Sequence, residues 1–169
     1  ERGDLDNFIA RLHKQKTRIY TQAVIDGKAE LRPGVRELIK AAGEAGVRLA
    51  IATTTSLPNV DALLRAAYNG SGDGIFEAIC AGDSVPAKKP APDIYTWVLD
   101  KMGLTGDQVV AFEDSGHGVT SAAEAGINRI LVTTNDYTAN QDFSRASVVL
   151  ESLEPSDQPA VDMAMLKNL

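Results

Sequence analysis

The feature that most constrains the fold of this chain is an alternation of short apolar runs with helix-length segments. Residues 47–52 form a nearly continuous apolar run, and similar runs follow near 75–80, 108–112 and 127–133. A short run that is apolar throughout is typical of a strand covered on both faces. Because helical segments of about ten residues separate these runs, the pattern predicts parallel βαβ units and an α/β fold.

The helices are predicted from apolar periodicity and from the Gly and Pro residues at their ends. A first helix runs from Leu5 to about Ile25 and stops at Asp26-Gly27, and a second runs from Pro33 to a stop at Gly46. Further helices are expected at 58–68, 93–103, 116–125 and, as a short one, at 139–145, with a last strand at 147–150. The end of the chain, 151–169, is interpreted as a weak surface helix or tail.

The composition limits the kinds of partner the chain can have. With 169 residues, 44% of them apolar, it can bury a substantial core, and its net charge of −6 argues against nucleic acid. No apolar run approaches the ~20 residues of a membrane span. The single cysteine, Cys80, lies in a strand-like run and is expected to be a buried, unreactive thiol. We expect a cytoplasmic monomer.

Three short segments look suited to hold one phosphate group. The hydroxyls of 53–56 follow the first apolar run, Lys89 lies in a loop stiffened by two prolines, and Glu113 and Asp114 end a third run. The carboxyl ends of parallel strands share one edge of a sheet, so these groups should converge there. Hydroxyls and an ammonium bind phosphate, and paired carboxylates suit Mg²⁺.

Each segment also has a purely structural interpretation. Ser56 could cap the following helix, and threonines favour strands by propensity. Lys89 could be a solvated loop lysine like its neighbour Lys88. Asp114 or Ser115 could cap the helix at 116–125. The order and shared location of the three segments favour a ligand site.

These segments resemble the motifs of a known family. The ordered set Ala-Thr-Thr-Thr-Ser, Lys-Lys-Pro-Ala-Pro-Asp-Ile-Tyr and Glu-Asp-Ser-x-x-Gly resembles motifs two, three and four of the haloacid dehalogenase superfamily. Within it the chain is similar to CbbY-like sugar-phosphate phosphatases, close to beta-phosphoglucomutase. The resemblance implies a three-layer Rossmann-like parallel sheet with the remnant of a helical cap domain. Residues 1–28 would be the last cap helix, 29–150 the core and 151–169 the tail.

The resemblance also implies roles for individual residues. Thr53 would hold the transferring phosphoryl group, and Lys89 would neutralise its charge in the transition state. Thr54 and Ser56 would add phosphate or substrate contacts. Glu113 and Asp114 would hold Mg²⁺. Lys16 would reach the distal phosphate of the substrate.

Lys16 could equally be a solvated helix lysine. Arg18 and Arg32 are further candidates for contact with a second phosphate.

One departure from the family pattern stands out. The family opens with a strand carrying Asp-x-Asp-Gly, whose first Asp is the nucleophile, and no apolar run here ends in that motif. In the family fold that strand lies between the strand ending at Thr53 and the strand ending at Glu113. The chain is therefore expected to leave a hole in its sheet, to be the C-terminal part of a longer product of the same gene, and to be inactive alone.

For the complete enzyme the resemblance implies Mg²⁺-dependent hydrolysis of a small sugar phosphate or bisphosphate, of the xylulose 1,5-bisphosphate type, through an aspartyl-phosphate. Two alternatives stay open. One is a phosphomutase with the same site and a cap that excludes water. The other is an inactive module that binds a phosphorylated ligand or a protein.

Overall fold

The structure is a computed structural model that describes residues 2–28, 30–68, 74–82, 84–154 and 162–167. The chain divides into two compact units. One unit comprises residues 1–31 and 55–73, and the other comprises residues 32–54 and 74–169. The first unit thus joins a stretch from the middle of the sequence to the N-terminal helix. The assignment of cap, core and tail made from the sequence stays a prediction.

The first unit contains the long helix α1 (Arg2–Ile25) and helix α3 (Leu57–Ala67). A polar network holds them together: Thr21 Oγ1 donates to Asn59 Oδ1 at 2.6 Å, and Asn59 Nδ2 donates to Thr55 Oγ1 at 3.1 Å. Asn59 is buried, and both polar atoms of its amide are satisfied by this network. Pro58 lies in the first turn of α3, where a missing N–H is tolerated.

The second unit holds every strand that the described residues form. Its elements in chain order are α2 (Val35–Glu44), β1 (Ala50–Thr53), β2 (Ala78–Ala81), α4 (Asp93–Met102), the 3₁₀ turn η1 (Gly106–Gln108), β3 (Ala111–Glu113), α5 (Gly116–Glu124), β4 (Ile130–Thr133), β5 (Val148–Leu150) and α6 (Met163–Lys167). All the strand pairs are parallel, which confirms the predicted α/β class. Among the described helices, none has the length and apolar character needed to cross a membrane.

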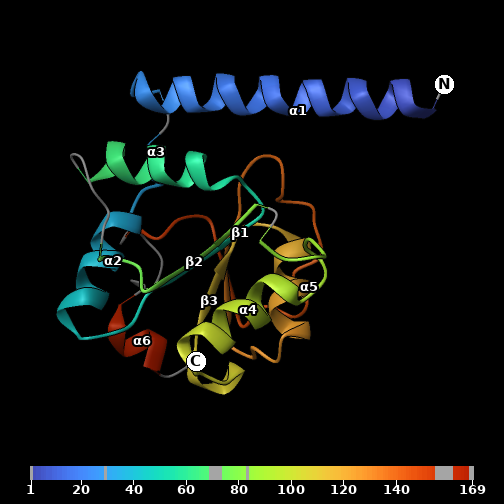
Figure 1. Ribbon diagram of the computed structural model, residues 1–169. Helices are drawn as coiled ribbons and strands as arrows, with labels where there is room; N and C mark the ends of the chain where they lie inside the picture. The colour runs from blue at the N-terminus through green and yellow to red at the C-terminus, as the bar shows by residue number, and fades with distance from the viewer. Residues whose placement is uncertain (1, 29, 69–73, 83, 155–161, 168–169) are drawn as a thin grey trace. The chain divides into compact units, whose positions relative to one another are not determined.

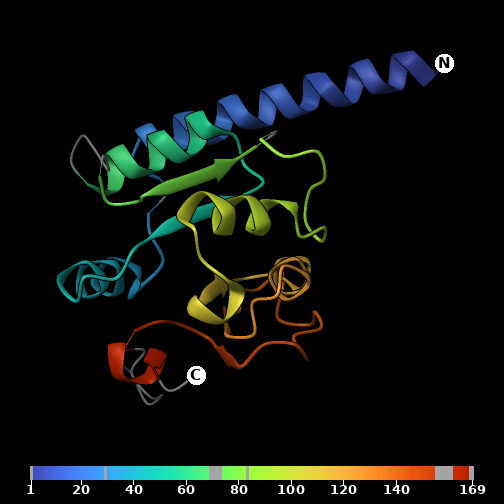
Figure 2. The same cartoon turned by 60° about the horizontal axis from the view of Figure 1, so that its bottom comes forward.

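In the described part of the chain the strands form two sheets, and β1 and β3 are in different ones. One sheet consists of β1 and β2, and the other has the order β3, β4, β5. Figure 1 and Figure 2 show β1 and β2 side by side, with α4 along one of their faces. The strand ending at Thr53 and the strand ending at Glu113 are thus in different sheets of the described structure, and the hole expected between them stays a prediction.

The hydrogen bonds show which edge of each strand lacks a partner. Thr53 O accepts from Gly82 N at 3.2 Å, so this carbonyl of β1 faces β2. The neighbouring carbonyl of Ala52 faces the other edge, because backbone groups alternate along a strand. On β3, Ala111 N donates to Arg129 O, so Phe112 presents its backbone to the edge away from β4. The Phe112 side chain is 40% exposed, which is unusual for a strand between buried neighbours.

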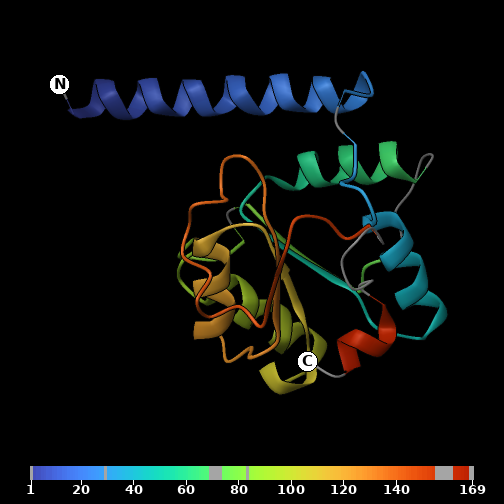
Figure 3. The same cartoon turned by 180° about the vertical axis from the view of Figure 1, so that it is seen from behind.

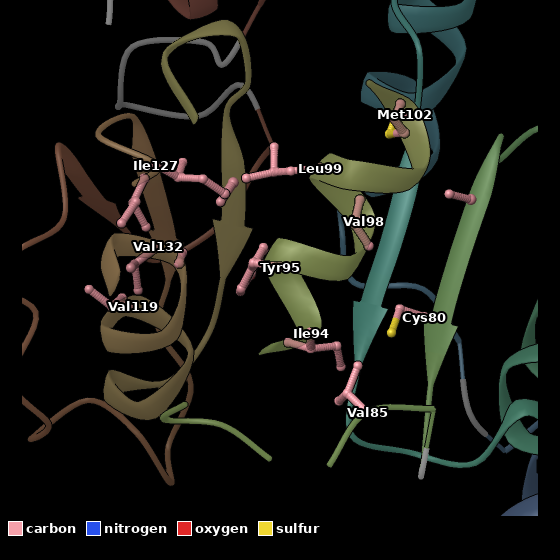
Figure 4. Close-up of a cluster of buried hydrophobic side chains, with 14 residues drawn as sticks. Cys80, Val85, Ile94, Tyr95, Val98, Leu99, Met102, Val119, Ile127 and Val132 are labelled. Atoms are coloured by element: carbon pink, nitrogen blue, oxygen red, sulfur yellow. The ribbon is translucent and has the colours of Figure 1, made fainter. Parts of the chain in front are cut away.

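The core of the second unit is built around α4. Figure 4 shows the buried side chains of α4, which pack toward the strands and toward α5. They are Ile94, Tyr95, Val98, Leu99 and Met102. Cys80 of β2 belongs to the same cluster and is fully buried, as predicted. Burial raises the pKa of the Cys80 thiol, which keeps it in the unreactive protonated form.

The first four strands begin three residues later than the apolar runs predicted, at Ala50, Ala78, Ala111 and Ile130. Hydrogen bonds give the reason for β1 and β4. Val47 N donates to Ala42 O at 2.9 Å, and Ile127 N donates to Ala122 O at 3.1 Å. Each bond closes a helix C-terminus around a glycine in the left-handed region, Gly46 or Gly126. The backbone after these glycines therefore ends a helix before the strand begins.

The prediction of a short helix at 139–145 is wrong. Figure 3 shows this part of the chain, in orange, as an irregular loop, and residues 139–145 form turns and a bend without helical structure. Asp142 Oδ1 accepts from Ser144 N at 2.9 Å, a side-chain turn that competes with helical hydrogen bonding. Gln141 Oε1 accepts from Gly116 N at 2.7 Å, so the loop closes over the start of α5.

Arg32 fastens the ends of β4 and β5. Its guanidinium donates to Thr133 O at 3.0 Å, to Thr134 O at 2.6 Å and to Glu151 O at 3.1 Å. Its Nη1 also lies 2.8 Å from Thr133 Oγ1. These bonds use both Nη atoms to hold the two strand ends, and a contact of Arg32 with a second phosphate stays a prediction.

Candidate functional site

The loop that carries Lys89 is held by polar contacts on both sides. Asp93 Oδ1 at the start of α4 accepts from Ala87 N at 3.2 Å. Ser121 of α5, which is fully buried, donates its hydroxyl to Ala91 O at 2.6 Å. The lysine is therefore presented by a loop tied to two helices, which reduces the entropy lost when it binds a ligand.

The Lys89 ammonium joins the ends of the two sheets. It donates to Ala52 O of β1 at 3.0 Å and to Glu113 Oε1 of β3 at 2.5 Å. The side chains of this ion pair are 14% and 5% exposed, respectively. Because an ammonium has three donors, one remains for a ligand oxygen. The structure thus places a partly available cation at the carboxyl edge of both sheets.

Tyr95 is a third member of this cluster. Its hydroxyl donates to Glu113 Oε1, the oxygen that also accepts from Lys89. Its ring lies under the ammonium, with Lys89 Nζ 4.9 Å from the ring centroid. Burial, and secondly the negative charge of Glu113, raises the pKa of Tyr95 well above its usual value. The phenol therefore stays a hydrogen-bond donor at neutral pH.

Glu113 and Asp114 have the oxygens a divalent cation would need. Lys89 and Tyr95 occupy Glu113 Oε1, whereas Oε2 has only a long contact of 3.4 Å from Asp114 N. Asp114 is exposed at the strand end. Within the described ranges no group of three or more His, Cys, Asp or Glu side chains could hold a metal. Two carboxylates nevertheless fit Mg²⁺, which usually keeps several waters.

The first turn of α5 packs against the carboxylate of Glu113. Ser115 caps this helix by accepting from Gly118 N at 3.2 Å, as the structural interpretation of its sequence anticipated. A side chain at Gly118 would overlap the Glu113 carboxylate, with a Cβ only 2.6 Å from Oε1 and closer still to Oε2. Glycine is therefore needed here so that the carboxylate can rest against the positive end of the helix.

The other predicted residues are placed as follows. Thr53 ends β1, next to the carbonyl that accepts from Lys89, and Thr54 is exposed after it. Ser56 and Lys16 belong to the other unit. Ser56 occupies the N-cap position of α3, yet its hydroxyl makes no cap bond and has no partner among the described residues. Lys16 is exposed on α1.

The sequence interpretation assigned no role to three residues that support the site. Tyr95 and Gly118 are the last residues of two of the quoted family motifs, and Ser121 lies outside them. Each contacts the Lys89 loop or lies against Glu113. A physical signal for Tyr95 was available, since a tyrosine on the buried face of α4 must find a partner for its hydroxyl.

Comparison with known proteins identifies the class. The model of the haloacid dehalogenase-like hydrolase family matches residues 3–126. This match covers well over half of the chain, and the chain therefore belongs to the haloacid dehalogenase-like hydrolases.

Within the family the chain is similar to CbbY proteins. It is 45% identical to CbbY of Rhodobacter capsulatus over 94% of its own length and 70% of that protein. A crystal structure of CbbY from Rhodobacter sphaeroides in complex with phosphate superposes with a TM-score of 0.85, at 41% identity, over 94% of this chain and 68% of that one. A mutant of that protein in complex with xylulose-(1,5)bisphosphate gives a TM-score of 0.80 at 44% identity, over 85% and 64%.

A more distant relative has a named activity. The phosphorylated carbohydrates phosphatase of Thermotoga maritima is 36% identical over 76% of this chain and 56% of that protein. Among the first four curated relatives, the chain spans between 52% and 70% of their length.

Proposed function

We propose that the chain provides the phosphate- and metal-binding part of a Mg²⁺-dependent phosphatase that acts on a small sugar phosphate. The observation that carries this proposal is the cluster at the strand ends, where Lys89 bridges Ala52 O and Glu113 Oε1. The cluster combines a cation with an open donor, an exposed carboxylate at Asp114 and the hydroxyl residue Thr53. Phosphoryl transfer needs this combination, because its catalysis is largely positioning and charge stabilisation.

In this proposal each residue acts on a different part of the reacting group. Lys89 donates its third N–H to a phosphoryl oxygen and offsets the charge that builds up there. Thr53 supports the same group from the end of β1. Glu113 and Asp114 would hold Mg²⁺, which supplies further charge neutralisation when it is bound.

The nucleophile is assigned to a segment outside the 169 residues. The unpaired edges of β1 and β3 support this assignment, since one more parallel strand between them would complete both ladders. Such a strand would end beside Lys89, because the carboxyl ends of β1 and β3 meet there. An aspartate at its end would lie within reach of a phosphate held by the ammonium.

For the substrate class we propose a sugar bisphosphate. The support is the CbbY relative whose structure holds xylulose-(1,5)bisphosphate and the carbohydrate phosphatase of Thermotoga maritima. In this proposal Lys16 of α1 and the buried hydroxyl of Ser56 belong to the part that contacts the substrate beyond its transferring phosphate. Cytoplasmic location and a monomeric state stay predictions from the sequence.

The decisive test is hydrolysis of p-nitrophenyl phosphate and of xylulose 1,5-bisphosphate with Mg²⁺. The 169-residue chain should give no turnover, and the chain extended upstream by an aspartate-bearing strand should give turnover that EDTA abolishes. Turnover by the short chain alone would refute the assignment of the nucleophile. A silent extended chain that still binds phosphate would favour the inactive binding module.

A second test addresses the anion site without requiring activity. Millimolar phosphate or sulfate should raise the unfolding temperature of the chain, and Lys89→Met should abolish this rise. Lys88→Met is the matched control, because Lys88 is an exposed lysine next to it. Equal stabilisation of all three proteins would place the anion elsewhere.

A further inference from the structure

Tyr95 connects the two charged groups of the site. Its hydroxyl and the Lys89 ammonium both donate to one oxygen of Glu113, and its ring lies 4.9 Å from the ammonium nitrogen. Lys89 and Tyr95 come from one short segment, the loop and the first turn of α4. A single rigid piece of chain therefore determines the position of the cation and the orientation of the carboxylate.

The second oxygen of Glu113 lies beside the backbone of Asp114 and Gly118. With two donors on Oε1, the contact of Oε2 in the described part of the chain is the long one from Asp114 N. The backbone of Gly118 lies so close to Oε2 that there is no room for a side chain at that position. The Glu113 carboxylate is thus fixed from both sides, with Oε2 on the side of Asp114.

We propose that Tyr95 is a positioning residue that turns Glu113 so that Oε2 can accept a divalent cation and Lys89 keeps a donor for phosphate. This inference rests on the proposed function of the same site. Without the hydroxyl, the ammonium is the only donor on Oε1 and can move to bridge both oxygens of Glu113. That movement would cover Oε2 and would draw Lys89 away from Ala52 O.

The alternative is that the hydroxyl bonds to Glu113 only because a buried phenol needs an acceptor. In that case Tyr95→Phe would change stability alone, and cation binding would be unaffected. The two interpretations therefore differ in a measurement that does not depend on activity. Tyr137→Phe is the matched control, because Tyr137 is 94% exposed.

The experiment is a titration of the 169-residue chain with Mn²⁺, followed by electron paramagnetic resonance, for the wild type, Tyr95→Phe and Tyr137→Phe. Tyr95→Phe should weaken Mn²⁺ binding roughly tenfold, the usual effect of removing a partner that orients a metal ligand. It should also reduce the thermal stabilisation by phosphate, while Tyr137→Phe should match the wild type. Wild-type Mn²⁺ affinity in Tyr95→Phe would overturn the proposal.

Crystal structures of the wild type and Tyr95→Phe separate this inference from the proposed function. If the wild type binds no Mn²⁺, the metal assignment of the proposed function fails, and the structures then decide the role of Tyr95. A rotated Glu113 carboxylate, or a Lys89 ammonium that has left Ala52 O, would support positioning by Tyr95. Unchanged positions of both groups would overturn it.

Discussion

Replacing Gly118 with alanine tests whether Glu113 is held as tightly as the structure indicates. The new Cβ would lie 2.6 Å from Glu113 Oε1 and closer still to the other carboxylate atoms, so the carboxylate must move. It would then lose its bonds to Lys89 and Tyr95. Hydrogen bonds to charged groups contribute about 1.5–3 kcal/mol each, and breaking a buried ion pair costs about 3–5 kcal/mol.

Two effects reduce the expected loss. Alanine is favoured over glycine in a helix by about 1 kcal/mol, and the ion pair can re-form in part. We therefore expect Gly118→Ala to lower the free energy of unfolding by about 2 kcal/mol. For a chain of this size this corresponds to a fall in Tm of about 6 °C. Thermal unfolding followed by circular dichroism measures it directly.

The control is Gly43→Ala. Gly43 lies in α2, and a Cβ there would meet nothing within 4 Å. This variant gains helix propensity without a clash and should be more stable than the wild type by up to about 1 kcal/mol. If Gly118→Ala is as stable as Gly43→Ala, Glu113 is free to move, and the rigid arrangement inferred for the site is wrong.

Three further substitutions probe separate parts of the second unit. Arg32→Ala should lower the free energy of unfolding, measured in urea, by about 1–2 kcal/mol, because it removes the exposed hydrogen bonds that fasten β4 and β5. Arg32→Lys should restore little of this stability. Ser121→Ala should cost about 1 kcal/mol in the same assay and should weaken phosphate stabilisation, because Ala91 O loses its donor in the Lys89 loop. Tyr95 has a raised pKa in the folded state, so its contribution to stability is present below pH 10, the usual tyrosine pKa, and is lost as the pH rises above it. Tyr95→Phe should therefore reduce the loss of stability seen between pH 9.5 and pH 11, and an unchanged loss would contradict this assignment.

The parallel fold could be predicted from the sequence because its signals are local. Each strand is an apolar run and each helix a periodic segment, so neighbouring residues contain the information. The first four strands were predicted to begin three residues too early, and for β1 and β4 the hydrogen bonds of the preceding helix explain the error. Val47 and Ile127 follow glycines that end helices, and their backbone N–H groups return to the preceding helix. The turn at Asp142 was missed because a side-chain acceptor replaced the helical one.

The separation of β1 from β3 was also predictable, although from a resemblance and not from periodicity. The family motif that should end an apolar run is not found in the sequence, and in the described part of the chain β1 and β3 belong to different sheets. Composition gave no indication of it, since the chain is as apolar as an ordinary domain.

The contacts that bring the two sheets together at the site could not be predicted, because they are long-range. Tyr95 and Glu113 are 18 residues apart, Lys89 and Glu113 are 24 apart, and Lys89 and Ala52 are 37 apart. Such contacts depend on which strands lie next to each other, and local patterns do not determine that order. The sequence could therefore place Lys89 and Glu113 at strand ends, but it could not show that Tyr95 donates to the same oxygen. It also follows that the site depends on how the two sheets are held together through Lys89, so cation and phosphate binding report on that arrangement as well as on the chemistry of the side chains.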